Sequence, residues 1–253
     1  MEMDPESYPM ESSAFEFSDK SVRRRLHKYI NMLEILYLDI FDFRKVYGIL
    51  TVQLIVTFGI VSIFIFVESI QQSLYENTAL FWIPFGLSIV FMIILACVPG
   101  LTRKTPWNFI FLLLFTICLG ATIGCICATY DTTDIWIAFG TTVAIVLALT
   151  LFAFQTKIDF TIMSGMLMSL VMMLIFFGIF ALIIGSRTLT IFYYCLGAFI
   201  FSIYIVFDTQ IIIGGKHKLA ISPEEYIFAA LNLYLDVINI FLYLLAIIGL
   251  ARG

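Results

Sequence analysis

The sequence predicts an all-α, polytopic membrane protein with seven transmembrane helices. Hydrophobic residues make up 62% of the 253 positions and charged residues only 13%, whereas an average soluble domain is about 45–50% apolar and about 25% charged. Sixteen of the 32 charged residues lie within residues 1–45, so the remaining 208 residues carry too few charges to cover a soluble fold. The apolar residues form seven stretches, each with the ~20 residues that a helix needs to cross ~30 Å of hydrocarbon.

Short connections separate the seven stretches, so we expect consecutive helices to lie antiparallel and in contact. The stretches cover residues 46–67, 79–98, 107–128, 135–154, 162–184, 188–213 and 226–250, and they form one transmembrane domain over residues 46–253. The last stretch has 25 residues. That length favours a full crossing over the alternative, a re-entrant segment.

The first 45 residues divide into two segments. Residues 1–20 are acidic and contain two prolines and several serines, which is typical of a disordered tail. Residues 21–45 place apolar side chains at spacings of three and four beside a run of basic ones. This pattern predicts a basic amphipathic helix, which either lies on an anionic cytosolic membrane surface or packs against the cytosolic ends of the bundle.

Lysine and arginine residues are divided unequally between the two sides of the predicted bundle. Twelve of the 14 lie on the side of the N-terminus, and the other side holds Arg187 and Arg252. By the positive-inside rule, this asymmetry predicts a cytosolic N-terminus. The net charge of −4 argues against a nucleic-acid partner, which would need a basic surface. The predicted partner is the lipid bilayer, and monomer and oligomer are equally compatible with this sequence.

One carboxylate lies deep inside a predicted span. Asp236 is the eleventh residue of the stretch 226–250, where an ionisable side chain is costly and indicates a function. The polar residues Asn232, Asp236, Asn239 and Tyr243 follow one another at spacings of four, three and four, so they share one helix face. Such a stripe faces either a polar cavity or a partner helix, and in the second case it serves interhelical hydrogen bonding alone.

A second carboxylate, Asp208, lies about five residues, or ~8 Å, inside the end of the sixth stretch. For Asp208 alone, an interfacial carboxylate at a helix end is the alternative interpretation. The seventh helix is predicted to begin at a capping box, Ser222–Glu225, which places Asp236 ~21 Å along its axis. The two carboxyls therefore meet only if the helices tilt or the first turns of the seventh helix stand above the membrane.

Close approach of Asp208 and Asp236 would make a proton-sharing pair, because two like charges cannot both ionise cheaply in a low dielectric. Loss of the proton leaves two repelling carboxylates that suit a hard cation such as Ca²⁺. The sequence thus suggests a pH-gated cation path, with the two aspartates as the gate and as ligands along a Ca²⁺ path. Ca²⁺ and H⁺ are then the permeant or regulatory ions, and no bound cofactor is expected.

Two acidic segments lie on the predicted non-cytosolic side, one between Glu68 and Glu76 and one containing Asp131 and Asp134. They either gather cations at a pore mouth or are solvated loop charges. No predicted span contains a paired His/Glu metal motif, a Gly-x-Ser-x-Gly turn or a Ser-Lys dyad. We therefore expect that the protein is not an enzyme.

A series of short motifs surrounds the two aspartates. Residues 207–210 are Phe-Asp-Thr-Gln, followed by Gly-Gly-Lys-His-Lys and then by Ser-Pro-Glu-Glu-Tyr-Ile-Phe-Ala-Ala-Leu-Asn-Leu-Tyr-Leu-Asp-Val-Ile-Asn over residues 222–239. Phe43–Tyr47, Gln53 and Arg103–Asn108 lie upstream. Through these motifs, residues 43–250 resemble the Bax-inhibitor-motif family, most closely its lifeguard branch.

The resemblance implies a bundle in which the last helix is central and the other six surround it. It implies that Asp208 and Asp236 form a pH-sensing pair, which an arginine at the cytosolic end of the second helix engages; the nearest arginine here is Arg103. Members of the family are associated with Ca²⁺ leak from intracellular stores and with suppression of apoptosis. The implied location is the endoplasmic reticulum or Golgi, with the plasma membrane as an alternative, and the implied protein partners are apoptosis-regulating membrane proteins.

Two functions of different classes follow. The leading interpretation is a channel-like Ca²⁺-leak protein that Asp208 and Asp236 gate, and that regulates intracellular Ca²⁺ stores and suppresses apoptosis. The alternative is a membrane adaptor that regulates death signalling through protein partners without conducting ions, with purely structural aspartates. A seven-span receptor is disfavoured by the short outer loops. The residues expected to line a pore or support the pair are Asn232, Asn239, Tyr243 and Arg103.

Overall fold

The computed structural model describes residues 43–98, 105–213 and 226–252. The predictions for residues 1–20, for most of segment 21–45, for Arg103 and for the capping box at 222–225 lie outside the described residues. Within the described ranges the chain is helical apart from short connections, and no β-strand occurs there. The predicted all-α class is confirmed.

Seven helices in the described ranges are long and apolar enough to cross a membrane. The first span covers Phe43–Phe66, and the fifth, Phe160–Ile184, joins a 3₁₀ turn, η1 (Phe160–Met163), to α7 (Ser164–Ile184). The other five are α3 (Ala79–Cys97), α5 (Trp107–Cys127), α6 (Thr132–Gln155), α8 (Arg187–Ile213) and α9 (Tyr226–Arg252). The seven predicted stretches agree with these bounds to within three residues at each end, because the bilayer itself sets the length of the apolar run.

One connection differs from its prediction. The segment expected as an acidic loop between Glu68 and Glu76 is a nine-residue helix, α2 (Glu68–Glu76). Glu68 lies in the first turn of α2, where a carboxylate interacts favourably with the helix dipole. A tight turn elsewhere depends on Gly185, whose φ of 65° ends α7 in the left-handed conformation that glycine adopts easily.

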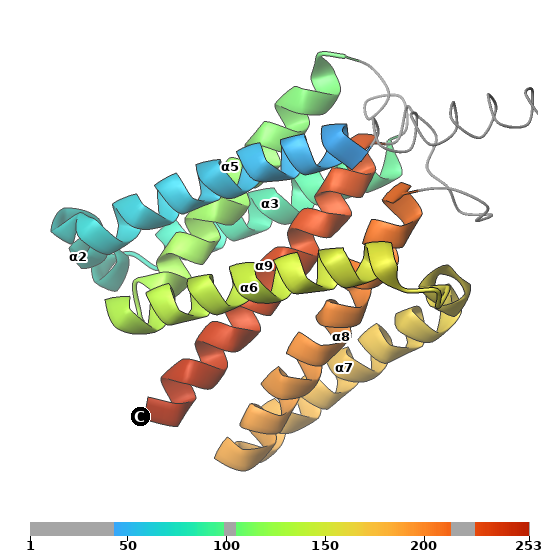
Figure 1. The fold of residues 1–253 in the computed structure, drawn as a ribbon. Coiled ribbons are helices and arrows are strands. Elements are labelled where there is room, and N and C mark those ends of the chain that lie inside the picture. The colour runs from blue at the N-terminus through green and yellow to red at the C-terminus, as the bar shows by residue number, and fades with distance from the viewer. Residues whose placement is uncertain (1–42, 99–104, 214–225, 253) are drawn as a thin grey trace, which may run out of the picture.

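The two ends of the bundle differ in charge. We call the end where the first span and α9 begin the basic end, and the opposite end the acidic end. The described basic residues at the basic end are Arg44, Lys45 and Lys157, and the acidic end carries Glu68, Glu76, Asp131, Asp134, Arg187 and Arg252. In Figure 1 the basic end lies at the right, and the C-terminus lies at the opposite end.

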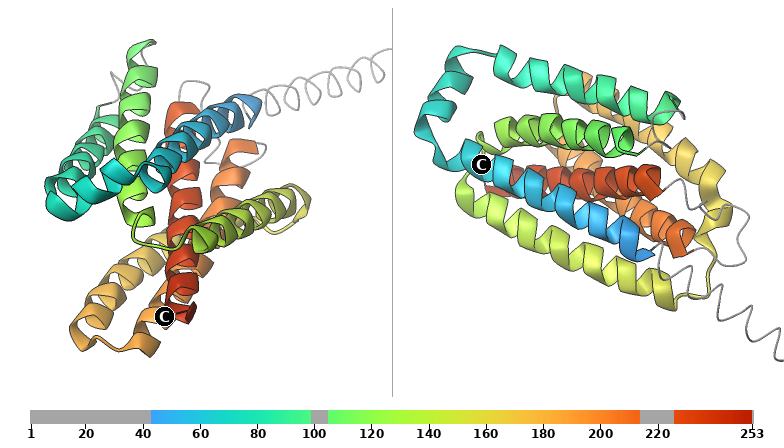
Figure 2. Two further views of the ribbon diagram at one scale, coloured as in Figure 1. Left: turned by 90° about the vertical axis from the view of Figure 1, so that its left-hand side faces the viewer. Right: turned by 90° about the horizontal axis from the view of Figure 1, so that it is seen from above.

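α9 is the central helix of the bundle. Half of its most apolar window is buried, the largest share of the seven described spans; the share is 44% for α5 and 22% or less for the other five. α9 packs against α8, α6 and α5, and Figure 2 shows it, in red, running between the other helices. Leu233, Ile240 and Leu245 on α9 are fully buried. The predicted central position of the last helix is therefore confirmed.

The outer helices present an apolar surface. α3 packs on α5, and α7 packs on α8, so both lie at the periphery. On α7, the side chains of Leu182 and Ile183 are 83% and 79% exposed. Such a surface is unfavourable in water and suits contact with lipid acyl chains. The chain is an integral membrane protein.

Candidate functional site: a buried carboxyl pair between α8 and α9

The structure brings together the two aspartates that the sequence places in spans. Asp208 on α8 and Asp236 on α9 are only 9% and 4% exposed, and their carboxyl groups are hydrogen-bonded to each other. A hydrogen bond between two carboxyls requires one of them to donate, because an ionised carboxylate only accepts. Two carboxyls this close and this buried favour sharing one proton, because both cannot ionise cheaply in a low dielectric. The pair lies between the central helix and its main neighbour, α8.

The two carboxyls meet although they lie at different distances from the described ends of their helices. Asp208 lies five residues before Ile213, the last described residue of α8. Asp236 lies ten residues after Tyr226, the first described residue of α9. Their contact satisfies the condition that the sequence analysis set for a carboxyl pair.

A hydroxyl network lies beside Asp208. The Tyr47 hydroxyl oxygen lies 2.9 Å from Thr209 Oγ1 and 3.2 Å from Thr150 Oγ1. Tyr47 belongs to the first span, Thr150 to α6 and Thr209 to α8, and Tyr47 is close enough to Asp208 to sense its charge. The Tyr47 side chain thus joins three helices next to the carboxyl pair.

The residue that follows Thr209 fixes the end of α8. Gln210 donates from Nε2 to the carbonyl of Ile158 at 2.9 Å, and its Oε1 accepts from the backbone N–H of Phe160 at 2.8 Å. Ile158 lies in the connection between α6 and η1, and Phe160 is the first residue of η1. The Phe-Asp-Thr-Gln motif therefore uses its last three side chains for three separate contacts around one helix turn.

One carboxyl oxygen of Asp236 lacks a hydrogen-bond donor from outside the carboxyl pair. Asp236 Oδ2 is buried and, apart from the carboxyl pair, has no hydrogen-bond partner among the described residues. The Tyr204 side chain, one turn before Asp208 on α8, is close enough to interact electrostatically with both carboxyls. A buried acceptor of this kind is unfavourable unless a proton or a cation occupies it.

The rest of the predicted stripe does not join the carboxyl pair. Asn239 donates from Nδ2 to the Leu235 carbonyl of its own helix at 2.8 Å. The Tyr243 ring packs against the rings of Tyr193 and Tyr194 of α8. Asn232 is half-buried one turn before Asp236. The structure thus places only Asp208 and Asp236 in mutual contact, and Arg103 lies outside the described residues.

A second polar network lies on the opposite face of α9. The Tyr234 side chain is fully buried, and its hydroxyl lies 2.7 Å from Thr57 Oγ1 of the first span. Gln53, one turn earlier on that span, donates from Nε2 to Thr116 Oγ1 of α5 at 3.1 Å. The sequence analysis assigned no role to Thr57, Thr116 or Tyr234. Single hydroxyls in apolar runs are common in spans, so only their pairing in space distinguishes them.

The acidic end is held by two arginines. Arg252, at the end of α9, forms an ion pair of 2.6 Å with Asp134 in the first turn of α6. Arg187, at the start of α8, donates to the carbonyl oxygen of Leu250. Asp134 is 3% exposed, so it is neither a solvated loop charge nor a free pore-mouth charge. Its position is buried because the end of α9 supplies the opposite charge.

The carboxyl pair by itself offers few ligands to a metal ion. Within the described ranges, no three His, Cys, Asp or Glu side chains cluster so that they could hold a metal. Two carboxyls supply fewer oxygens than the six to eight that Ca²⁺ takes. A cation at this pair would keep water ligands, which suits transit better than retention.

Sequence comparisons find relatives over most of the chain. The family model described as "Inhibitor of apoptosis-promoting Bax1" matches residues 34–253, which include both aspartates. Protein lifeguard 3 of Homo sapiens is 39% identical over 210 residues, covering 81% of this chain and 67% of that protein. The Golgi anti-apoptotic protein of Vaccinia virus (strain Lister) is 33% identical over 211 residues, covering 83% of this chain and 85% of that protein.

Proposed function

We propose that this chain, which belongs to the family of inhibitors of apoptosis-promoting Bax1, is an anti-apoptotic membrane protein whose helical bundle leaks Ca²⁺. The leak is gated by the proton that Asp208 and Asp236 share. Family membership rests on the match over residues 34–253, and the lifeguard relative confirms the resemblance seen in the sequence. The anti-apoptotic role and a Golgi or endoplasmic-reticulum location are supported by the name of the viral relative.

The observation that carries the gating mechanism is the hydrogen bond between two buried carboxyls on adjacent helices. With one proton present, the pair is an attractive contact between α8 and the central α9. Without it, two unit charges about 4 Å apart repel by about 4 kcal/mol at an effective dielectric constant of about 20. That energy corresponds to a shift of roughly a thousandfold in a two-state equilibrium between closed and open bundles.

The sign of the pH dependence follows from this contact. At low pH the shared proton is present, and the closed arrangement of α8 and α9 is stabilised. As the pH rises through the titration range of the pair, this stabilisation is lost and the open arrangement gains population. The two carboxylates then face the opened path and attract Ca²⁺, which crosses with part of its water shell.

The test is Ca²⁺ efflux from proteoliposomes that contain the purified protein, measured from pH 5 to pH 8. We expect wild-type efflux to increase with pH. The variant Asp236→Asn keeps a hydrogen-bonding side chain but cannot lose a proton, so we expect low efflux that does not change with pH. The variant Asp208→Asn makes the same change at the other carboxyl, and we expect the same low, pH-independent efflux.

The matched control is Asp131→Asn, which makes the same chemical change at an exposed residue of the acidic end. We expect this variant to keep the wild-type pH profile. A wild-type pH profile in Asp236→Asn would contradict the proposed gate. Absence of efflux from wild type at every pH would instead favour the adaptor function, in which the pair only holds the helices together.

A further inference from the structure

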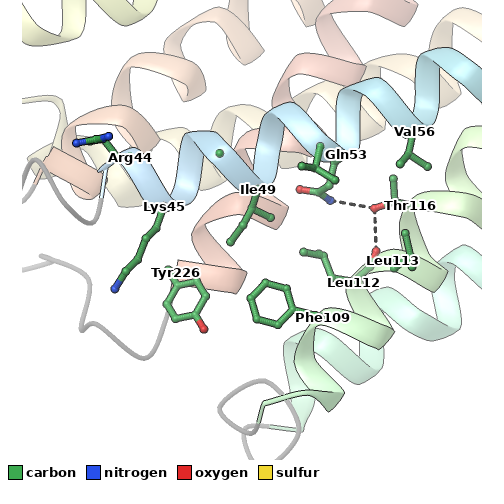
Figure 3. Close-up of a pocket in the computed structure, with 12 residues that line it drawn as sticks. Arg44, Lys45, Ile49, Gln53, Val56, Phe109, Leu112, Leu113, Thr116 and Tyr226 are labelled. Carbon is green, nitrogen blue, oxygen red and sulfur yellow. Dashed lines mark hydrogen bonds between the residues drawn. The ribbon is translucent and has the colours of Figure 1, made fainter.

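A groove separate from the carboxyl pair lies between the first span and α5. Its volume is about 620 Å³, and Figure 3 shows the side chains that surround it. Val52, Phe109 and Leu113 line it, and they are 59%, 41% and 48% exposed on the outer face of the bundle. The groove is therefore open to the position that lipid occupies around a membrane protein.

The groove has the length of a lipid acyl chain that lies in one leaflet. On the first span its lining runs from Arg44 to Val56, which is 13 residues, or about 18 Å of helix from the first to the last. One leaflet contributes about half of the ~30 Å of hydrocarbon. The walls between these two residues are mainly apolar, with Ile49 and Val52 on one side and Leu113 on the other. An acyl chain fits this combination of length and chemistry.

The mouth of the groove is positively charged. Arg44 and Lys45 line its end at the basic end of the bundle, and Lys45 Nζ lies 5.6 Å from the centroid of the Tyr226 ring. Both cations belong to the first turn of the first span, at the level where a membrane has its headgroups. Basic pockets between transmembrane helices recognise anionic headgroups.

A polar side chain lines the deeper part of the groove. Gln53 is 4% exposed, and its Nε2 donates to Thr116, as the dashed line in Figure 3 shows. Its Oε1 is buried and accepts no hydrogen bond from the described residues. A buried acceptor is unfavourable without a donor. In the occupied groove, a water molecule that enters with the ligand donates to Gln53.

From this geometry we infer that the groove between the first span and α5 binds an anionic glycerophospholipid of the adjacent leaflet. The phosphate lies against Arg44 and Lys45, and one acyl chain lies along Ile49 and Val52. Gly48 leaves room for the glycerol region, because a Cβ at this position would meet no atom within 4 Å. The charge of the mouth selects an anionic lipid over a zwitterionic one.

The test is native mass spectrometry of the full chain in detergent with added dioleoyl phosphatidylserine or dioleoyl phosphatidylcholine. We expect one phosphatidylserine molecule per protein, retained at least fivefold more than phosphatidylcholine. The double variant Arg44→Gln with Lys45→Gln should abolish this preference. The variant Gly48→Leu places a side chain in the groove and should reduce retention of both lipids at least fivefold.

Each variant has a control of matched chemistry. Lys157→Gln removes an exposed charge at the same end of the bundle but outside the groove. Gly59→Leu adds the same side chain on the same span, where a Cβ also meets no atom within 4 Å. We expect wild-type retention in both controls, which separates a groove from general attraction to charge or to added bulk.

Three outcomes would overturn the inference. One is equal retention of the two lipids by wild type, and another is wild-type retention in both groove variants. The third is an equal loss in the groove variants and in their controls. Size-exclusion chromatography checks that each variant is monodisperse. If one groove variant aggregates, the lipid retention of the other still tests the inference, because charge removal and steric filling test the same occupant independently.

Discussion

At the residue scale, the side chains that matter most are polar ones that bond between helices. The Tyr47 hydroxyl contacts Thr209 and Thr150, and it lies next to Asp208. Thr209 is fully buried, so its hydroxyl depends on a protein partner. The family motif that ends in Tyr47 and the motif that contains Asp208 are therefore two halves of one contact, although 160 or so residues separate them along the chain.

Removal of this phenolic oxygen should weaken the bundle. We expect Tyr47→Phe to lower the free energy of unfolding by about 1–2 kcal/mol, because two hydrogen bonds are lost and one buried hydroxyl must find a new partner. Reversible denaturation in mixed micelles measures this change. Tyr226→Phe removes a hydroxyl that forms no hydrogen bond to a side chain of the described residues, and it should change stability by less than about 0.5 kcal/mol. Equal losses in the two variants would argue against the network.

At the element scale, α8 and α9 owe their close approach to one glycine. A Cβ on Gly197 would lie 2.6–2.8 Å from three atoms of the Tyr243 ring. That ring is held between Tyr193 and Tyr194, so it cannot move aside easily. Gly197 therefore sets how near the two helices that carry the carboxyl pair can come.

A methyl group at this position should separate the two helices. We expect Gly197→Ala to lower the free energy of unfolding by about 1–3 kcal/mol relative to Gly140→Ala. Gly140 is the control because a Cβ there meets no atom within 4 Å, so both variants gain the same helix propensity. Micelle denaturation measures the difference. Pairing Gly197→Ala with Tyr243→Leu should recover part of the loss, and a purely additive double variant would mean that the clash is absent.

The helices can be predicted from the sequence wherever a single physical requirement determines them. A span needs a certain apolar length, so the seven stretches predict the spans closely. The short helix α2 and the buried position of Asp134 are different cases. Glu68–Glu76 has no apolar run that marks it, and the burial of Asp134 depends on Arg252, which lies at the other end of the transmembrane domain. The residues near Asp134 in the sequence therefore do not reveal that its partner is Arg252.

At the scale of the whole molecule, hydropathy alone does not identify the central helix. The span Phe160–Ile184 has a mean hydropathy of 2.9 and is 22% buried, whereas α9 has 2.2 and is 50% buried. In a membrane the outer helices face lipid, so the most apolar helix can lie at the periphery, and the central helix can carry the polar residues. The central position of α9 was predicted from the family resemblance rather than from apolar content, and the polar stripe predicted only that one face of α9 meets a cavity or another helix.

The charge difference between the two ends leads to a prediction about the whole molecule. Twelve of the 14 lysines and arginines belong to segments that the sequence predicts on the side of the basic end, and seven spans place residues 43 and 252 at opposite ends. By the positive-inside rule, we expect the basic end to face the cytosol and the C-terminal end of α9 to face away from it. The native sequence contains no Asn-x-Ser/Thr sequon, so glycosylation of an added tail reports orientation without background.

The measurement attaches the same sequon-bearing tail to the N-terminus in one variant and to the C-terminus in another. We expect a glycosidase-sensitive mass shift only for the C-terminal tail, because glycosylation takes place on the non-cytosolic side of the membrane. Each tail with its sequon Asn replaced by Gln is the control. A shift for the N-terminal tail would reverse the orientation, and shifts for both tails would show a mixed topology. With the reversed orientation, the phospholipid that binds beside Arg44 and Lys45 would have to come from the other leaflet.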